Sequence, residues 1–332
     1  MKRVIIFIFF NVMLFANENI YLDAKVLIKM VEKDDIQFIA AENMKNYIRG
    51  SKMILTNTLF SSNILGEMEC TPLYSCPNKI KEVFSYLNIQ DNQPLILYDN
   101  SYGVYASTLY TILESVGYKN ITILNGGAEA ISSLDPNQKL YDKYSTKLNK
   151  LLTIKKDLNA SENRVEIQST IQTLRKRLTI LKPYLLVEQK VVKPEKIGEN
   201  TYTLGKKNVS YLLSKNDLKK AVEAVRNHDN NITIIDSCPM IDIVGNAYGS
   251  YVAGVKSISW KNLIDKKENR LKSMDELKTI FNKLDKHQEY NLYCMSNSNK
   301  ALFMMTVMRY IGYNKVKAFT GDWSVWTGDE NE

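Results

Sequence analysis

The chain contains an internal repeat, and this repeat restricts its possible folds more than any other feature of the sequence. An apolar run at residues 36–41 recurs at residues 232–237, an offset of 196 residues. Four later landmarks recur at an offset of 195 residues without a gap: Asp99 is matched by Cys294, Ala106 by Ala301, Gly117 by Gly312, and Gly126 by Gly321. A nearly constant offset over this many landmarks indicates a tandem duplication of one structural unit.

Each copy alternates short apolar runs with amphipathic segments. Leu95 to Tyr98 form a continuous apolar run, which is typical of a parallel strand buried on both faces. Helices are predicted at residues 17–35 (leading into a strand), 79–87, 105–116 and 301–310. The alternation predicts an α/β fold in which a parallel sheet flanked by helices is used twice. The length of 332 residues is sufficient for two domains that each bury a core.

Residues 1–16 differ from the rest of the chain. A basic start (Lys2, Arg3) is followed by an apolar run and by Ala16, after which the sequence becomes polar. This pattern is typical of a cleavable secretory signal, and it predicts a periplasmic or secreted protein. The alternative is an uncleaved membrane anchor, but the run is shorter than the roughly 20 residues that a span needs. No membrane span is expected after signal cleavage.

Export changes the interpretation of the cysteines. Cys70 and Cys76 lie in a loop flanked by prolines, and in an oxidising compartment this spacing favours a local disulfide over two unpaired thiols. The two histidines, His228 and His287, both lie in polar surroundings, so neither a zinc site nor a Ser-His-Asp triad is expected. We therefore predict neither a metal nor a cofactor.

The strongest chemical signal is Cys294, which ends an apolar run and precedes small polar residues and a predicted helix. Backbone amides at the start of a helix stabilise negative charge, so this thiol should ionise more readily than a free one. The predicted cradle of amides comprises Met295, Ser296, Asn297, Ser298, Asn299 and Lys300. The alternative is a buried and chemically inert core cysteine.

A basic insert at residues 135–215 separates the copies. Apolar residues at helical spacing predict a helical hairpin with Ser161 as an N-cap, followed by a linker or short hairpin at residues 187–204. Residues 139–220 contain 19 Lys and Arg against 8 Asp and Glu, a surplus of 11 positive charges. This surface could bind nucleic acid or anionic lipid. A solvated helical connector is favoured because no known nucleic-acid-binding motif accompanies the lysines, so no nucleic-acid partner is expected and the partner of the hairpin is left open.

Taken together, these segments resemble the tandem, two-domain form of the rhodanese family. The resemblance is carried by residues 234–237 (Ile-Ile-Asp-Ser), 251–255 (Tyr-Val-Ala-Gly-Val), 293–294 (Tyr-Cys), 312–316 (Gly-Tyr-Asn-Lys-Val) and 321–326 (Gly-Asp-Trp-Ser-Val-Trp), and in the first copy by 98–99 (Tyr-Asp) and 124–127 (Leu-Asn-Gly-Gly). The resemblance implies a non-catalytic domain at residues 17–134, where Asp99 replaces the cysteine. It implies a catalytic domain with Cys294 at residues 216–332.

The resemblance further implies a sulfurtransferase. Cys294 would take sulfane sulfur from a thiosulfate-, polysulfide- or mercaptopyruvate-type donor as a persulfide and pass it to a thiol, cyanide or sulfite. The sequence departs from the family pattern at three places. Asn297 occupies a position where family members usually have a glycine. Asparagine tolerates a left-handed backbone better than most residues, so the cradle of amides can still form. Cys238 and Asn299 stand where an arginine often holds the donor, so a bidentate clamp is missing and Lys300 supplies only a point charge.

Asp236 is expected to support the site. For Cys238 there are three hypotheses: it resolves the Cys294 persulfide, it forms a reversible disulfide with Cys294, or it fills the space of the missing arginine. A non-catalytic scaffold that acts through the basic insert is the alternative to an enzyme. A cysteine phosphatase is disfavoured because that chemistry needs an arginine six residues after the cysteine, where this chain has Lys300.

Overall fold

The computed structural model describes residues 20–28, 36–59, 77–135, 137–157, 163–180, 186–188, 205–206, 208–238, 255–294 and 296–321. The predicted signal peptide at residues 1–16, the Cys70–Cys76 pair, Ser161 and Met295 lie outside the described residues. The predicted linker at 187–204 lies outside them except for residues 187 and 188.

The N-terminal copy is built on a five-stranded parallel sheet. Its strands are β1 (Tyr21–Asp23), β2 (Gln37–Ala40), β4 (Lys52–Met53), β5 (Leu95–Tyr98) and β6 (Ile121–Asn125), in the order β1-β6-β5-β2-β4. The helices of this copy are α1 (Ala24–Ile28), α2 (Pro77–Tyr86), α3 (Val104–Ser115) and α4 (Gly127–Ser132), with a 3-10 turn η1 (Thr56–Leu59). All four residues of the central strand β5 are buried, as its apolar sequence predicts.

The C-terminal copy repeats this sheet. Its strands are β8 (Leu212–Leu213), β9 (Ile232–Asp236), β10 (Lys256–Ser257), β13 (Glu289–Tyr293) and β14 (Val316–Phe319), all parallel, in the order β8-β14-β13-β9-β10. Its other elements are α7 (Lys215–Arg226), η3 (Trp260–Leu263), the hairpin β11 (Ile264–Asp265) and β12 (Arg270–Leu271), α8 (Met274–Ile280) and α9 (Ser298–Tyr310). Strand for strand the two orders are the same, so the predicted α/β fold with two tandem copies is confirmed.

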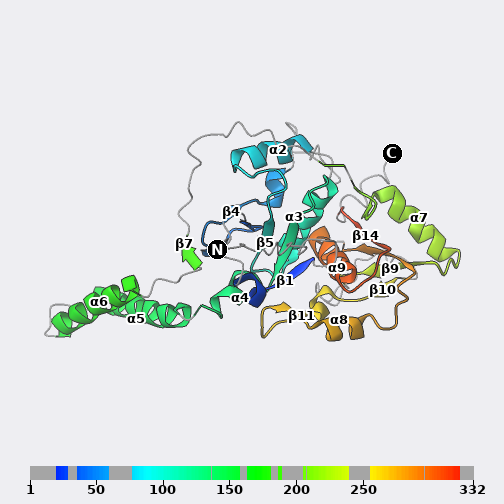
Figure 1. The fold of residues 1–332 in the computed structure, drawn as a ribbon. Helices are drawn as coiled ribbons and strands as arrows, with labels where there is room; N and C mark the ends of the chain where they lie inside the picture. The colour runs from blue at the N-terminus through cyan, green and yellow to red at the C-terminus, as the bar shows by residue number, and fades with distance from the viewer. Residues whose placement is uncertain are drawn as a thin grey trace, which may run out of the picture.

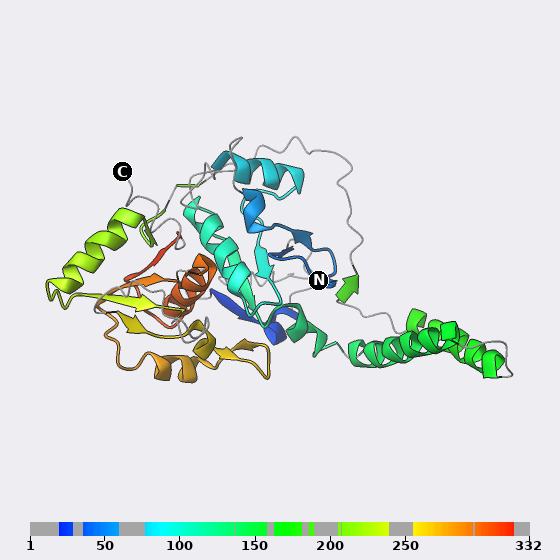
Figure 2. The same cartoon turned by 180° about the vertical axis from the view of Figure 1, so that it is seen from behind.

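The two copies pack against each other through equivalent helices. Helices α3 and α9 lie side by side between the two sheets (Figures 1 and 2). Glu114 of α3 and Arg309 of α9, which are 195 residues apart, form two charge-assisted hydrogen bonds of 2.7 Å each. The hydroxyl group of Tyr21 bridges the copies, because it lies 3.1 Å from Ser107 Oγ and 2.7 Å from Thr306 Oγ1. The duplicated unit therefore contacts itself about a local pseudo-twofold axis.

The insert forms a helical hairpin, as its apolar spacing predicts. Helices α5 (Gln138–Asp157) and α6 (Asn163–Ile180) pack on each other and project away from both sheets (Figures 1 and 2). After them, β7 (Leu186–Glu188) pairs antiparallel with β3 (Asn46–Ile48) of the N-terminal copy. Among the described residues, no helix has the length and apolar character needed to cross a membrane.

The prediction for residues 17–35 was wrong in its order. The described part of this segment begins with strand β1 and continues as the short helix α1. Tyr21 and Leu22 pair with Ile123 and Leu124 of β6. Both side chains are buried, and pairing at the edge of the sheet outweighs the helical spacing of the apolar residues.

Candidate active site

The candidate site lies at the carboxyl end of the C-terminal sheet, and an equivalent loop lies at the same end of the N-terminal sheet. Ligands bind at this edge in open parallel sheets because the connecting loops and helix N-termini converge there. In one copy the loop leads from β5 into α3, and in the other it leads from β13 into α9. Asp99 and Cys294 are the first residues of these loops.

The loop of the N-terminal copy is an anion-binding cradle that the chain fills with its own carboxylate. Asp99 is buried, and its Oδ1 accepts hydrogen bonds from the amides of Ser101 and Gly103 at 2.9 and 2.7 Å. Its Oδ2 accepts a third from the amide of Ala106 at 2.8 Å. Tyr102 and Gly103 both have positive φ, 64° and 89°, and this left-handed pair turns the amides toward the carboxylate.

A second carboxylate stands beside Asp99. Glu42 accepts hydrogen bonds from the Ser101 hydroxyl group at 2.8 Å and from the Asn100 amide at 2.5 Å. Burial raises the pKa of Asp99 to about 6, and the nearby negative charge of Glu42 adds to the rise, whereas the three backbone amides oppose it. Gly127 closes the other side of the loop, where any Cβ would collide with the carbonyl oxygen of Asp99.

In the C-terminal copy, a disulfide joins Cys294 to Cys238, with the two Cα atoms 5.2 Å apart. This is the arrangement that one of the hypotheses for Cys238 describes. Both cysteines are buried, with exposed fractions of 0% for Cys294 and 4% for Cys238. The amide of Cys238 donates to the Asp236 carboxylate at 2.8 Å, so Asp236 positions the residue that carries the second sulfur.

Among the cradle residues that the structure describes, none donates a backbone amide to Cys294 Sγ in this disulfide form. Among the described residues, the polar neighbour of Cys294 Sγ other than Cys238 is the Ser296 hydroxyl group, at 3.4 Å. Asn297 is extended, with φ −170° and ψ 105°, and not left-handed as its place in the loop suggested. Its side chain caps α9 by accepting from the amide of Asn299 at 2.9 Å. That amide is therefore used within the loop.

Two other predicted cradle side chains point elsewhere. Asn299 Oδ1 accepts a hydrogen bond from Thr108 Oγ1 in α3 of the other copy, at 3.0 Å. The Lys300 ammonium group lies over the ring of Trp260, 5.6 Å from its centroid. Ser298 is the first residue of α9. The side chain of Asn299 is thus held by the other copy, whereas that of Lys300 contacts its own copy.

The sequence interpretation missed Glu42. It lies 196 residues before Cys238, the offset already found for the preceding strand pair. The pair Glu42 and Asp99 therefore occupies in one copy the place that the pair Cys238 and Cys294 occupies in the other. Extending the repeat alignment by two residues beyond the strand would have found it.

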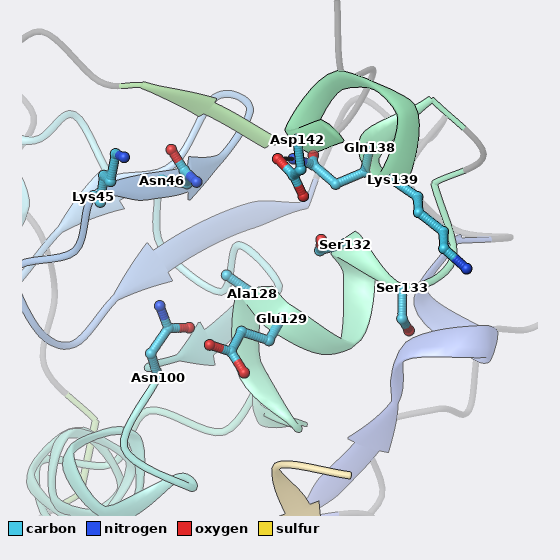
Figure 3. Close-up of a pocket in the computed structure, with 10 residues that line it drawn as sticks. All are labelled: Lys45, Asn46, Asn100, Ala128, Glu129, Ser132, Ser133, Gln138, Lys139 and Asp142. Atoms are coloured by element: carbon cyan, nitrogen blue, oxygen red, sulfur yellow. Dashed lines mark hydrogen bonds between the residues drawn. The ribbon is translucent and has the colours of Figure 1, made fainter. Parts of the chain in front are cut away.

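A polar pocket of about 660 Å³ opens beside the loop of the N-terminal copy (Figure 3). Its lining residues are Lys45, Asn46, Asn100, Ala128, Glu129, Ser132, Ser133, Gln138, Lys139 and Asp142. Two of its buried oxygens, Asn100 Oδ1 and Gln138 Oε1, have no hydrogen-bond partner among the described residues. The copy whose loop begins with Asp99 instead of a cysteine thus has a polar hollow next to its filled cradle.

Comparison with known proteins agrees with this geometry. Residues 23–134 match the rhodanese-like domain family, and no curated protein sequence matches the chain. The Escherichia coli SseA structure, described as a 3-mercaptopyruvate sulfotransferase, is 19% identical with a TM-score of 0.59, over 92% of this chain and 99% of that one. The yeast mitochondrial complex I sub-stoichiometric sulfur transferase subunit is 15% identical with a TM-score of 0.62, over 94% of this chain and 97% of that one. The Leishmania major 3-mercaptopyruvate sulfurtransferase is 11% identical with a TM-score of 0.58, over 94% and 75% of the two chains.

Identities this low show that the fold is shared, and the shared fold extends over both copies and not only over residues 23–134. Residues 23–134 therefore contain a rhodanese-like domain, and the chain as a whole shares the two-copy fold of these solved structures.

Proposed function

We propose that the chain is a sulfurtransferase in which Cys294, once its disulfide is reduced, accepts sulfane sulfur as a persulfide. The observation that carries the proposal is the filled cradle of the N-terminal copy. There, three backbone amides hold a buried anion on the residue that corresponds to Cys294. A loop of this design stabilises negative charge at the first residue after the central strand, and a persulfide anion needs the same stabilisation.

The proposed reaction is a nucleophilic substitution at sulfur. The Cys294 thiolate attacks the outer sulfur of the donor, a sulfur–sulfur bond forms, and the leaving group departs with the electron pair of the broken bond. With thiosulfate the leaving group is sulfite. An external thiol, cyanide or sulfite then attacks the outer sulfur and regenerates the thiolate. Helix α9, which is 13 residues long, begins four residues after Cys294, and its N-terminus favours the anionic forms.

The donor class is the open part of the proposal. The structural relatives include proteins described as acting with 3-mercaptopyruvate, which makes small anionic donors the first to test. Neither position 238 nor position 299 holds an arginine that could bind such a donor through bidentate hydrogen bonds. We expect weak saturation by thiosulfate and better loading by polysulfide, whose recognition does not need a bidentate cation.

Loading of sulfur onto Cys294 tests the proposal directly. The full chain is reduced with a phosphine, freed of reductant and mixed with thiosulfate, mercaptopyruvate or polysulfide. The mass of the peptide that contains Cys294 is then measured. The Cys238→Ser variant should gain one sulfur atom on Cys294, and the Cys238→Ser/Cys294→Ala variant should gain none there. If no donor loads Cys294 in Cys238→Ser, the sulfurtransferase proposal fails and a non-catalytic binding role for the basic hairpin becomes the better one.

We also propose that the protein is exported to the periplasm or secreted, on the strength of residues 1–16. Fractionation of cells and N-terminal sequencing of the mature protein test this. An intact N-terminus in the cytosolic fraction would contradict it.

A further inference from the structure

We propose that Cys238 is a second catalytic residue, which attacks the persulfide on Cys294, releases hydrogen sulfide and closes the Cys238–Cys294 disulfide. This inference rests on the proposed persulfide and adds the fate of its sulfur. Its product would be sulfide rather than a sulfur atom handed to an external acceptor.

The backbone holds the two cysteines together independently of the bond between them. Strands β9 and β13 pair in register up to Asp236 and Tyr293. Beyond the last pair, Ser237 donates from its amide and from its hydroxyl group to the Tyr293 carbonyl oxygen, at 2.9 and 2.8 Å. The Cys238 amide is then fixed by the Asp236 carboxylate. These contacts place Cys238 beside Cys294 with the Cα separation that a disulfide requires.

The N-terminal copy supplies an internal control for this placement. There the amide of Ala41 donates to the Tyr98 carbonyl oxygen, as Ser237 does to Tyr293. The two residues that follow in the repeat, Glu42 and Asp99, have no covalent bond, yet both of their carboxylates bind Ser101, Glu42 through the hydroxyl group and Asp99 through the amide. The fold therefore brings these two side-chain positions together whether or not they are cysteines.

The step balances in atoms and electrons. A sulfur–sulfur bond forms between Cys238 Sγ and Cys294 Sγ, and the bond between Cys294 Sγ and the outer sulfur breaks. The outer sulfur leaves as hydrosulfide, taking the electron pair of the broken bond and the proton of the Cys238 thiol. Two thiol sulfurs are oxidised to the disulfide, and the sulfane sulfur is reduced to sulfide.

Proximity makes this step faster than transfer to a thiol in solution. A nucleophile that is fixed next to its target acts at an effective concentration far above the millimolar level of free acceptors. Both sulfurs are also buried, which favours attack from inside the protein over attack by bulk thiol. The disulfide must then be reopened by a dithiol reductant, which supplies the two electrons of the cycle and is itself oxidised to a disulfide.

A single-turnover experiment tests the inference. The full-length chain is reduced with a phosphine, freed of reductant and mixed with one equivalent of thiosulfate or mercaptopyruvate, whose leaving groups are not sulfide, in the absence of any added thiol. Released sulfide is measured, and the thiol, disulfide or persulfide state of each cysteine is mapped by alkylation and mass spectrometry. We expect about one sulfide per chain, with Cys238 and Cys294 returned to the disulfide, in line with the one-to-one step.

Two variants separate this inference from the sulfurtransferase proposal. Cys238→Ser should retain the persulfide on Cys294 and release no sulfide, and Cys294→Ser should neither load nor release sulfur. A wild-type chain that keeps its persulfide on Cys294 beside a free Cys238 thiol would overturn the role of Cys238 and leave sulfur transfer standing. Absence of loading in both wild type and Cys238→Ser would overturn both.

Discussion

Reduction of the Cys238–Cys294 disulfide is expected to lower the free energy of unfolding by about 4 kcal/mol at 25 °C. The bond spans 56 residues. In the chain-entropy account, opening a loop of this size returns about 4 kcal/mol of conformational entropy to the unfolded chain. The folded state should change little, because the strand ends are held by the bonds of Ser237 and by the Asp236 carboxylate. The decrease in the free energy of unfolding therefore comes almost entirely from the higher conformational entropy of the unfolded chain.

Urea unfolding followed by far-ultraviolet circular dichroism measures this loss. The oxidised wild type, the phosphine-treated wild type and Cys238→Ser are compared at one pH and temperature. Phosphine-treated Cys238→Ser should unfold at the same urea concentration as the phosphine-treated wild type. Its own response to phosphine reports any contribution from Cys70 and Cys76, which makes it the matched control. The reasoning is refuted if phosphine destabilises wild type no more than it destabilises Cys238→Ser.

Three further predictions concern the N-terminal copy and the contact between copies. A disulfide should form under mild oxidant in the variant Glu42→Cys/Asp99→Cys, made in a Cys238→Ser/Cys294→Ser background. If peptide mapping finds the two new thiols free, the equivalence of this pair to Cys238 and Cys294 is contradicted. Burial raises the pKa of Asp99 from 3.8 to about 6, so between these two pH values the folded state binds a proton that the unfolded chain has lost. The contribution of Asp99 to the free energy of unfolding should therefore fall as the pH rises through this range. Asp99→Asn should flatten that part of the stability profile, and an unchanged slope would count against it. Arg309→Met should lower the free energy of unfolding by about 2–3 kcal/mol, because it leaves Glu114 without its cationic partner in a mostly buried site. A double-mutant cycle with Glu114→Gln should give a coupling energy of about 1–2 kcal/mol. Additive losses of stability would exclude a direct interaction.

Fold class and duplication could be predicted from the sequence because both depend on burial along the chain. A run such as Leu95 to Tyr98 has no polar face, so it can be stable only as a central strand covered on both sides. The repeat then transfers the same assignment to β13, where Glu289 is the one residue of five that is not buried. Short edge elements were less predictable. Tyr21 and Leu22 form a strand because β6 offers a partner, which local spacing cannot reveal.

The position of Cys294 at the end of a central strand was likewise fixed by sequence, through the repeat and the apolar run before it. The sequence also placed Cys238 at the end of the neighbouring strand, but the register of β9 on β13 decides whether two such side chains meet. Register depends on long-range backbone pairing, and a shift of one residue would turn a side chain to the other face of the sheet.

Tertiary structure alone decided how the loops use their amides. In one copy the carboxylate of Asp99 collects three of them, and in the other the side chain of Asn297 takes the amide of Asn299. It also decided that the Asn299 side chain bonds to Thr108 across the copies. Hydrogen bonds between distant side chains depend on how whole elements pack, and no local pattern specifies them. The sequence determined which residue stands at the end of the central strand, where we propose that sulfur is carried, and the packing of the two copies determined what surrounds it.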